Sequence, residues 1–372
     1  MIIWIIFLSI CYFLLFLYEN PKANNKQKSY ILVGLVLFCV YFSTFRDGLG
    51  SDYTAYQSFC ERNRVYSEIW LLMEPIPAFL YNVCYITKIS AVLFFFVTSV
   101  IVCVSSFWVY SKFENFYLSA FLFLTYTILF LASFNLVRQF TAAAIILIAT
   151  YYFVMKKRSP WFFLFVLLAF LWHKSAIFSI IIFFLRRKKI NSLLWIFILF
   201  TSWVFPADLL YNIPIVGDMF NTLNYMDYFS YDELAYSKTS ITNLYMHFMI
   251  LLCLFYKNKV KGNDKVCFNL TLKLSIVGLI FFNISANSMA FAYRLGIFFS
   301  VFLPILFSYL PTLINKDFAK TIVYIPILFL LFVVLVNKKD DRVYCPERIL
   351  PIESIFDDNY HPYENPEVEL II

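Results

Sequence analysis

Glycine and charge are both scarce in this chain of 372 residues. Only 7 residues are glycine, and neither GxGxxG nor GxxxxGK[ST] occurs, which excludes the glycine-rich loops that cradle nucleotide phosphates. Asp, Glu, Lys and Arg make up 14% of the chain, against roughly 25% in an ordinary soluble domain. The 8 cysteines form no CxxC pair, so zinc-binding and thiol-redox motifs have no support.

Hydrophobic residues are abundant instead. They make up 62% of the chain, and the mean hydropathy is +0.76. Polar side chains are too few to cover such a chain in water, so lipid must be much of its solvent. This excludes a cytosolic enzyme, a secreted disulfide scaffold and a disordered regulator. The net charge of +7 lies in short clusters between apolar runs, which is typical of membrane proteins and argues against nucleic acid as a partner.

Apolar runs predict the fold class, since a spanning helix needs about 20 mostly apolar residues. We predict an all-α, polytopic integral membrane protein with about 10–12 transmembrane helices. Residues 1–336 form its single membrane domain, and 337–372 form an acidic tail. Two stretches are ambiguous: 76–87 is short, and 161–185 is interrupted by His173 and Lys174. The ten clearer runs are 2–18, 29–45, 89–110, 117–133, 139–155, 191–209, 243–256, 266–285, 291–310 and 321–336.

Lysine and arginine predict the orientation. Four short basic loops, within 22–28, 156–158, 186–189 and 257–265, are expected in the cytoplasm. Three longer segments hold more acidic than basic side chains, and we expect them on the outer, periplasmic side. These segments are the loops 46–75 and 210–241 and the tail 337–372.

The basic loops also bear on the ambiguous stretches. One span over 161–185 would place the following arginines and lysines outside, whereas two half-spans, 161–172 and 175–185, return them to the cytoplasm. We therefore predict a re-entrant helical hairpin with His173 at its apex near the outer face, and a segment 76–87 that only dips into the membrane. A single span over 161–185 is the alternative.

Polar residues at the ends of the predicted spans gather on the outer side, where costly polar groups indicate function. Each has a structural explanation when taken alone, such as a helix cap for Asp52 or a snorkelling side chain for Arg138. His247 has no polar company in the sequence, and we interpret it as structural. The set on the outer side comprises Arg46, Asp47, Asp52, Tyr53, Tyr56, Glu74, Asn135, Arg138, Gln139, His173 and Arg294.

This combination suits glycosyl transfer from a lipid pyrophosphate. Arginine stays charged, and its planar fork matches phosphate oxygens. Asp52, Glu74 or His173 is a candidate base for a sugar hydroxyl. We predict no metal or other cofactor, because no spacing of residues demands one. The carboxylates of Asp47, Asp52 and Glu74 are nevertheless oxygen ligands of the kind that Mg²⁺ binds.

The motifs resemble those of the EpsG family, among the Wzy-type O-antigen and capsule polymerases. Arg-x-Gly-x-Gly-x-Asp-Tyr-x-x-Tyr is matched from Arg46 to Tyr56, and Glu-Pro is matched at Glu74-Pro75. Asn-x-x-Arg-Gln is matched from Asn135 to Gln139, His-x-Ser-Ala from His173 to Ala176, and a late arginine at Arg294. The resemblance covers roughly 30–310. Ile-Pro-Ala-Phe after Glu74-Pro75 departs from the Gly-Phe that is frequent in the family.

The resemblance implies a GT-C-like polymerase in the bacterial inner membrane. Its substrate would be an undecaprenyl-pyrophosphate-linked oligosaccharide, transferred at the periplasmic face onto the non-reducing end of another lipid-linked repeat unit. A chain-length regulator and a flippase would be pathway partners. The expected catalytic residues are Asp52, Glu74, Arg138 and His173, and the expected substrate-binding residues are Arg46, Asp47, Tyr53, Tyr56, Asn135, Gln139 and Arg294.

Three other functions remain open at this point. An O-antigen ligase would share the donor and differ in its acceptor, which no stretch of sequence decides. A flippase or secondary transporter would show internal repeats and polar groups at mid-membrane, and neither pattern is visible. A non-catalytic scaffold would tolerate the loss of Arg46, Arg138 and His173.

Overall fold

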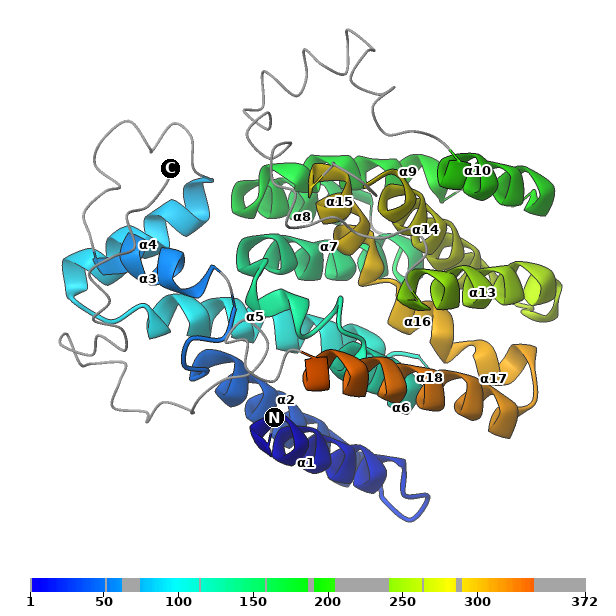
Figure 1. Ribbon diagram of the computed structural model, residues 1–372, viewed down its shortest axis with the longest axis horizontal. Coiled ribbons are helices and arrows are strands. Elements are labelled where there is room, and N and C mark those ends of the chain that lie inside the picture. Colours follow the sequence, from blue (N-terminus) through cyan, green and yellow to red (C-terminus); the bar gives the residue numbers. More distant parts are fainter. Residues whose placement is uncertain are drawn as a thin grey trace, which may run out of the picture. The chain divides into compact units, whose positions relative to one another are not determined.

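The computed structural model describes residues 2–50, 52–61, 74–113, 115–157, 159–186, 191–204, 241–262, 264–285 and 290–337. Every regular element in these ranges is helical, which confirms the predicted fold class (Figure 1). Contacts group the chain into two compact units. The first comprises the chain up to Val104, the short segment Phe134–Arg138 and the chain from Val334. The second comprises Ser105–Ser133 and Gln139–Val333.

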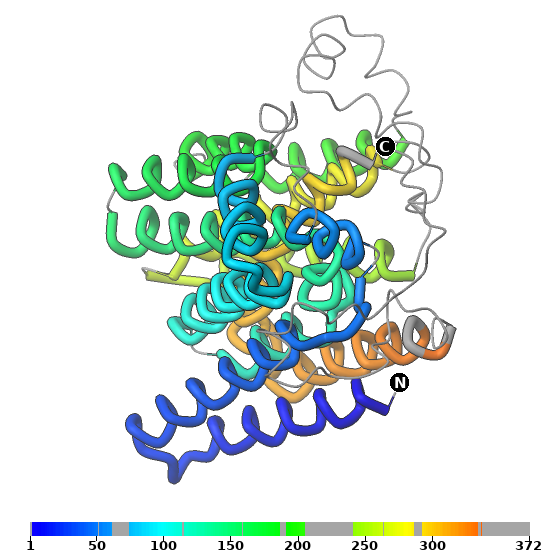
Figure 2. The backbone as a smooth tube through the Cα atoms, turned by 90° about the vertical axis from the view of Figure 1, so that its left-hand side faces the viewer, coloured from blue at the N-terminus to red at the C-terminus, as the bar shows by residue number. Residues whose placement is uncertain are grey.

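The first unit begins with a hairpin of two long helices, α1 (Ile2–Glu19) and α2 (Asn25–Thr44), which pack side by side (Figure 2). A capping box starts α2, because Asn24 and Gln27 each accept a hydrogen bond from the other's backbone N–H. These helices match the runs predicted at 2–18 and 29–45.

Two shorter helices of the first unit, α3 (Tyr53–Glu61) and α4 (Pro75–Thr87), pack against each other ahead of α5 (Val92–Tyr110). Proline suits the first turn of α4, where no backbone N–H is needed. The helix ends at Lys88, which adopts the left-handed conformation with φ 54°. At 13 residues α4 is too short to cross a bilayer alone, as expected for 76–87.

The second unit is built around α14 (Asp264–Ser285), which packs against helices on several sides and has a largely buried surface. Three of the remaining elements, η3, α7 and α18, begin in one unit and end in the other. The remaining elements, in chain order, are α6 (Phe116–Thr125), η3 (Ala132–Phe134), α7 (Val137–Met155), α8 (Ser159–Trp172), η4 (Lys174–Ile180), α9 (Ile181–Leu185), α10 (Ser192–Val204), α13 (Ile241–Tyr256), η7 (Lys257–Lys259), α15 (Ala290–Ser300), α16 (Leu303–Ser308), α17 (Leu310–Leu313) and α18 (Lys316–Asn337).

The stretch 161–185 reverses direction at His173. The helix α8 packs against η4, and the rings of Phe163 and Phe183 lie 5.4 Å apart. In one straight helix these two residues would be about 30 Å apart, at 1.5 Å per residue. The hairpin prediction is therefore confirmed in its geometry, and the single helix is excluded.

Two predicted spans are wrong in their extent. The run 117–133 is helical only to Thr125, after which Tyr126 is extended and the backbone N–H of Phe130 donates to the carbonyl of Phe123 at 3.1 Å. The run 291–310 is broken after Ser300, ahead of a proline that starts α16.

Carbonyls released by the second break find side-chain donors. The hydroxyl of Tyr110 donates to the carbonyl of Val301 at 2.9 Å, and that of Ser119 donates to the carbonyl of Pro304 at 2.9 Å. Irregular backbone at membrane depth requires such partners, because lipid offers none. The break is therefore accommodated within the packed interior of the second unit.

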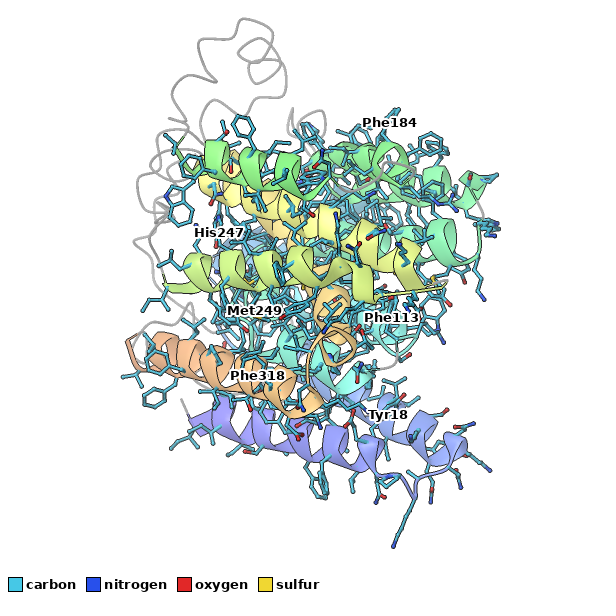
Figure 3. All side chains as sticks on the ribbon, turned by 90° about the vertical axis from the view of Figure 1, so that its right-hand side faces the viewer. Tyr18, Phe113, Phe184, His247, Met249 and Phe318 are labelled. Atoms are coloured by element: carbon cyan, nitrogen blue, oxygen red, sulfur yellow. The ribbon has the colours of Figure 1, made fainter. Side chains whose placement is uncertain are left out.

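Five helices of the described chain are long and apolar enough to cross a membrane, namely α1, α2, α5, α7 and α14. Large apolar side chains also remain exposed on outward faces, such as Phe200 of α10, which is 69% exposed, and Phe184 of α9 (Figure 3). Apolar faces of this extent mark a surface that lipid covers. The structure thus supports a membrane protein.

Candidate functional site

The turn after α2 is organised around a buried arginine. Arg46 is 1% exposed, and its guanidinium lies between the rings of Phe95 and Phe134, with centroid distances of 4.6 and 4.7 Å. It donates to the backbone carbonyls of Ser43 and Leu49, the latter at 3.2 Å. Burial lowers the pKa of Arg46 to about 10, so it stays charged at neutral pH. These contacts favour a role in shaping the turn.

Gly50 brings this turn against the segment that precedes α7. Its φ of +115° lies outside the range that side chains favour. A Cβ at this position would lie 2.6 Å from the carbonyl oxygen of Phe134 and 2.8 Å from the side-chain oxygen of Asn135. The two segments approach so closely because residue 50 has no side chain. Gly48 also has a positive φ, of 63°.

Glu74 and Arg138 form an ion pair between residues 64 positions apart. Glu74 occupies the N-cap position of α4, yet its side chain makes no cap hydrogen bond and binds the guanidinium instead. The Glu74 side chain is 8% exposed and that of Arg138 is 23% exposed. The carboxylate is therefore enclosed, while the arginine side chain is partly exposed.

Aromatic residues of α3 and α4 surround this ion pair. Tyr56 interacts with Arg138, and its hydroxyl also donates to the backbone carbonyl of Asn135 at 3.5 Å. Tyr81 is fully buried, and its ring lies 6.5 Å from that of Tyr56. The hydroxyl of Tyr81 and Nε of Arg138 are buried without a hydrogen-bond partner. Buried polar groups without a partner are rare, which makes these two atoms candidates for contact with a polar ligand.

The other expected residues of the first unit lie along the same turn. Asp47 is buried, and Asp52 is partly exposed directly before α3, where its carbonyl accepts the N–H of Tyr56 at 3.0 Å. Tyr53 stacks on Phe95 at 4.8 Å with an interplanar angle of 11°. This unit thus brings Glu74, Tyr56, Asn135 and Arg138 together.

Gln139 and Arg294, both in the second unit, are in contact. The amide nitrogen of Gln139 donates to the backbone carbonyl of Arg294. Gln139 is 2% exposed, so this contact ties the start of α7 to α15 inside the unit. The contact involves the backbone carbonyl of Arg294.

His173 caps the first turn of η4 from the apex of the hairpin. Its Nδ1 accepts the backbone N–H of Ser175 at 3.3 Å and lies 2.7 Å from the hydroxyl of Ser175. A neutral imidazole whose Nδ1 accepts a hydrogen bond carries its proton on Nε2. The cap therefore assigns the Nε2–H tautomer, which is a donor.

Sequence reasoning missed the residues that hold these groups in place. Phe95, Phe134 and Tyr81 sit within apolar runs, where nothing distinguishes them from core residues. His247, interpreted as structural because no polar residue accompanies it in the sequence, has polar partners in the structure. Its Nε2 lies 3.1 Å from the amide nitrogen of Asn283, which also donates to Ser202 at 2.9 Å (Figure 3 shows His247 on α13).

This second cluster is a buried hydrogen-bonded network between three helices. Asn243 donates to Asn283 at 3.2 Å, and both side chains are fully buried. The network joins α10, α13 and α14 of the second unit. Its hydrogen bonds fix how these helices pack together, which apolar contacts alone do not specify. Four residues from three distant parts of the sequence form the network, so no local sequence pattern predicted it.

No group of three or more His, Cys, Asp or Glu that could hold a metal ion occurs in the part of the chain that the structure describes.

Comparison with known proteins gives one match. The family model described as the EpsG family matches residues 28–351, which is most of the chain and includes every candidate site residue. No curated protein and no solved structure matches the chain.

Proposed function

This chain belongs to the EpsG family, whose members resemble polymerases of the Wzy type, and we propose that it is a membrane polysaccharide polymerase. It transfers a glycan from a lipid pyrophosphate onto the non-reducing end of another lipid-linked repeat unit. The carrier is undecaprenyl pyrophosphate, and the reaction takes place at the periplasmic face of the bacterial inner membrane, in O-antigen or capsule synthesis. The long apolar helices support the lipid setting.

The observation that carries this proposal is the Glu74–Arg138 ion pair. Arg138 holds a fixed positive charge that is partly exposed, with Nε left for a further acceptor. A pyrophosphate leaving group gains negative charge as its bond to the sugar breaks, and a preorganised guanidinium stabilises that charge. Arg138 therefore binds the leaving pyrophosphate, and Glu74 is the positioning residue that orients it.

The reaction requires one proton acceptor. The acceptor hydroxyl attacks the anomeric carbon of the donor sugar, the new C–O bond forms, and the bond to the pyrophosphate oxygen breaks with its electron pair. The hydroxyl proton passes to a base. Among the three candidates, Glu74 has Oε2 committed to Arg138, and His173 has Nδ1 committed to its cap.

We assign the base to Asp52 from its position and its exposure. It lies at the start of α3, one residue before the tyrosine that stacks on Phe95, and it is partly exposed. His173 then acts through Nε2–H as a hydrogen-bond donor to the glycan. Arg46 and the glycines shape the turn that presents Asp52. The remaining candidates bind the glycan and the lipid headgroup, and they are Asp47, Tyr53, Tyr56, Asn135, Gln139 and Arg294.

A polymerisation assay with purified protein and defined lipid-linked repeat units tests the proposal. The protein should produce lipid-linked polymer and release undecaprenyl pyrophosphate, and Asp52→Asn should abolish both while leaving membrane insertion intact. Transfer only to a lipid A core would identify a ligase, and passage of substrate across the bilayer without polymer would identify a transporter.

Topology has a separate test. A cysteine placed at Thr54, which is exposed on α3 beside Asp52, should react with a membrane-impermeant reagent added outside, and a cysteine at Lys157, also exposed, should not. Labelling of position 157 from outside would contradict the proposed periplasmic site.

A further inference from the structure

A cavity of about 250 Å³ opens in the second unit. Its wall is formed at the end of α7, in the loop before α14 and at the junction of α16 and α17. Met155, on the wall, lies at the opposite end of α7 from Gln139, about 24 Å away at 1.5 Å per residue. The cavity is therefore separate from the Gln139–Arg294 contact.

Three lysines line this cavity, with one carboxylate among the described lining residues: Lys112, Lys259, Lys261 and Asp264. Lys259 is fixed on the wall, because its Nζ donates to the carbonyl of Leu313 at 2.7 Å and lies 4.5 Å from the centroid of the Tyr256 ring. The lining is thus net positive, which suits an anion.

Positive charge is also crowded just outside the cavity. Partial burial, and then the charge of Lys265, lower the pKa of Lys257. Lys156 and Lys157 directly follow Met155 and are exposed. A bound anion would relieve the repulsion among these cations.

Aromatic side chains indicate where the membrane surface lies on this unit. The Nζ of Lys112 lies 4.9 Å from the centroid of the Trp108 ring, and that ring contacts Tyr151 at 5.1 Å and Tyr152 at 6.0 Å. All three rings are partly exposed. Clusters of tryptophan and tyrosine at helix ends mark the headgroup level of a bilayer. The lysine cavity therefore lies at the depth of lipid phosphates.

We infer that this cavity binds the phosphate headgroup of an anionic phospholipid. Apolar surface for the acyl chains is adjacent: Met155 on the rim is 38% exposed, and Phe255 of α13, one residue before the tyrosine that contacts Lys259, is 79% exposed. A soluble anion would have no use for that surface. Basic pockets between transmembrane helices bind acidic headgroups through the same combination of charge and apolar wall. The inference does not depend on the proposed enzymatic activity.

The test compares two triple variants with the same change in charge. The cavity variant replaces the three lysines of the lining and carries Lys112→Gln, Lys259→Gln and Lys261→Gln. The control variant replaces three lysines at the α1–α2 connection of the first unit and carries Lys22→Gln, Lys26→Gln and Lys28→Gln. Each protein is purified from nanodiscs of phosphatidylcholine with phosphatidylglycerol, and the retained phosphatidylglycerol is counted by native mass spectrometry.

The wild type and the control should each retain bound phosphatidylglycerol, whereas the cavity variant should lose it. Each lysine removed from the cavity should weaken retention by about fivefold. Equal retention by all three proteins, or equal loss in the control, would overturn the inference. If the triple variant does not fold, Lys112→Gln and Lys261→Gln are measured singly against Lys112→Arg, which keeps the charge.

A second arm distinguishes a lipid from a free phosphate. Thermal unfolding is followed in nanodiscs of pure phosphatidylcholine while inorganic phosphate is added. The unfolding temperature should rise with phosphatidylglycerol and not with phosphate. An equal rise with phosphate would assign the cavity to a soluble anion and refute the lipid.

Discussion

Replacing Glu74 by glutamine is the sharpest test of the Glu74–Arg138 ion pair. Glutamine keeps the shape of the side chain and removes its charge, leaving Arg138 in a site where its side chain is only 23% exposed. Breaking a buried ion pair by removing one partner costs about 3–5 kcal/mol. Because this pair is partly open to the surface, we expect a loss of about 2–3 kcal/mol in the free energy of unfolding, at or below the lower end of that range.

Activity separates a positioning role for Glu74 from a role as base. If Glu74 only orients Arg138, then Glu74→Gln should slow polymerisation in the wild type and have no further effect once Arg138 is glutamine. The assay is the rate of polymer formation by the two single variants and the double variant, each normalised to folded protein in the membrane.

The double-mutant cycle gives a clear refutation. Should Glu74→Gln lower the rate by the same factor in both backgrounds, the two residues act independently, and the proposed coupling through the ion pair is wrong. The exposed Glu19→Gln, at the end of α1, is the control for removing a carboxylate, and its rate should equal that of the wild type.

Three further predictions follow from the local geometry. Gly50→Ala should destabilise the protein by at least about 2 kcal/mol in thermal unfolding and abolish polymer formation, because the added Cβ would overlap the backbone of Phe134. The control is Gly34→Ala, where no atom lies within 4 Å of the added Cβ, and it should be neutral or stabilise the protein by up to about 1 kcal/mol. His173→Asn keeps a cap acceptor but lacks Nε2–H, so the unfolding temperature should stay near the wild-type value while polymer is lost; wild-type polymer lengths would rule out the donor role. Asn283→Leu removes the centre of a buried network and should lower the free energy of unfolding by about 2–4 kcal/mol, and an unchanged denaturation midpoint would count against that network.

Local patterns predicted much of the fold. The apolar helix α1 and the capped helix α2 begin and end close to their predicted limits, because a long apolar run leaves a chain in lipid few other conformations. The reversal at His173 was predicted from the sides on which basic loops must fall. The two wrong spans, 117–133 and 291–310, failed because their helix ends lie among apolar residues that hydropathy treats alike.

The candidate site was predictable in its residue types and not in its contacts. The motif from Arg46 to Tyr56 contains Gly50, and the structure shows the close backbone approach that requires a glycine there. The pairing of Glu74 with Arg138 was not foreseen, nor was the enclosure of Arg46 by two phenylalanine rings. Both depend on which helix faces pack together.

The sequence by itself determined that this chain is helical, that it resides in lipid and that its polar residues are confined to few places, because solvent and backbone hydrogen bonding act on every segment separately. Only the tertiary structure decided which of those polar residues meet. Asn283, buried among apolar neighbours along the chain, becomes the centre of a network through helices that are remote in sequence. Such contacts arise from the packing of whole helices, and the sequence of a single segment does not show which other helices lie beside it.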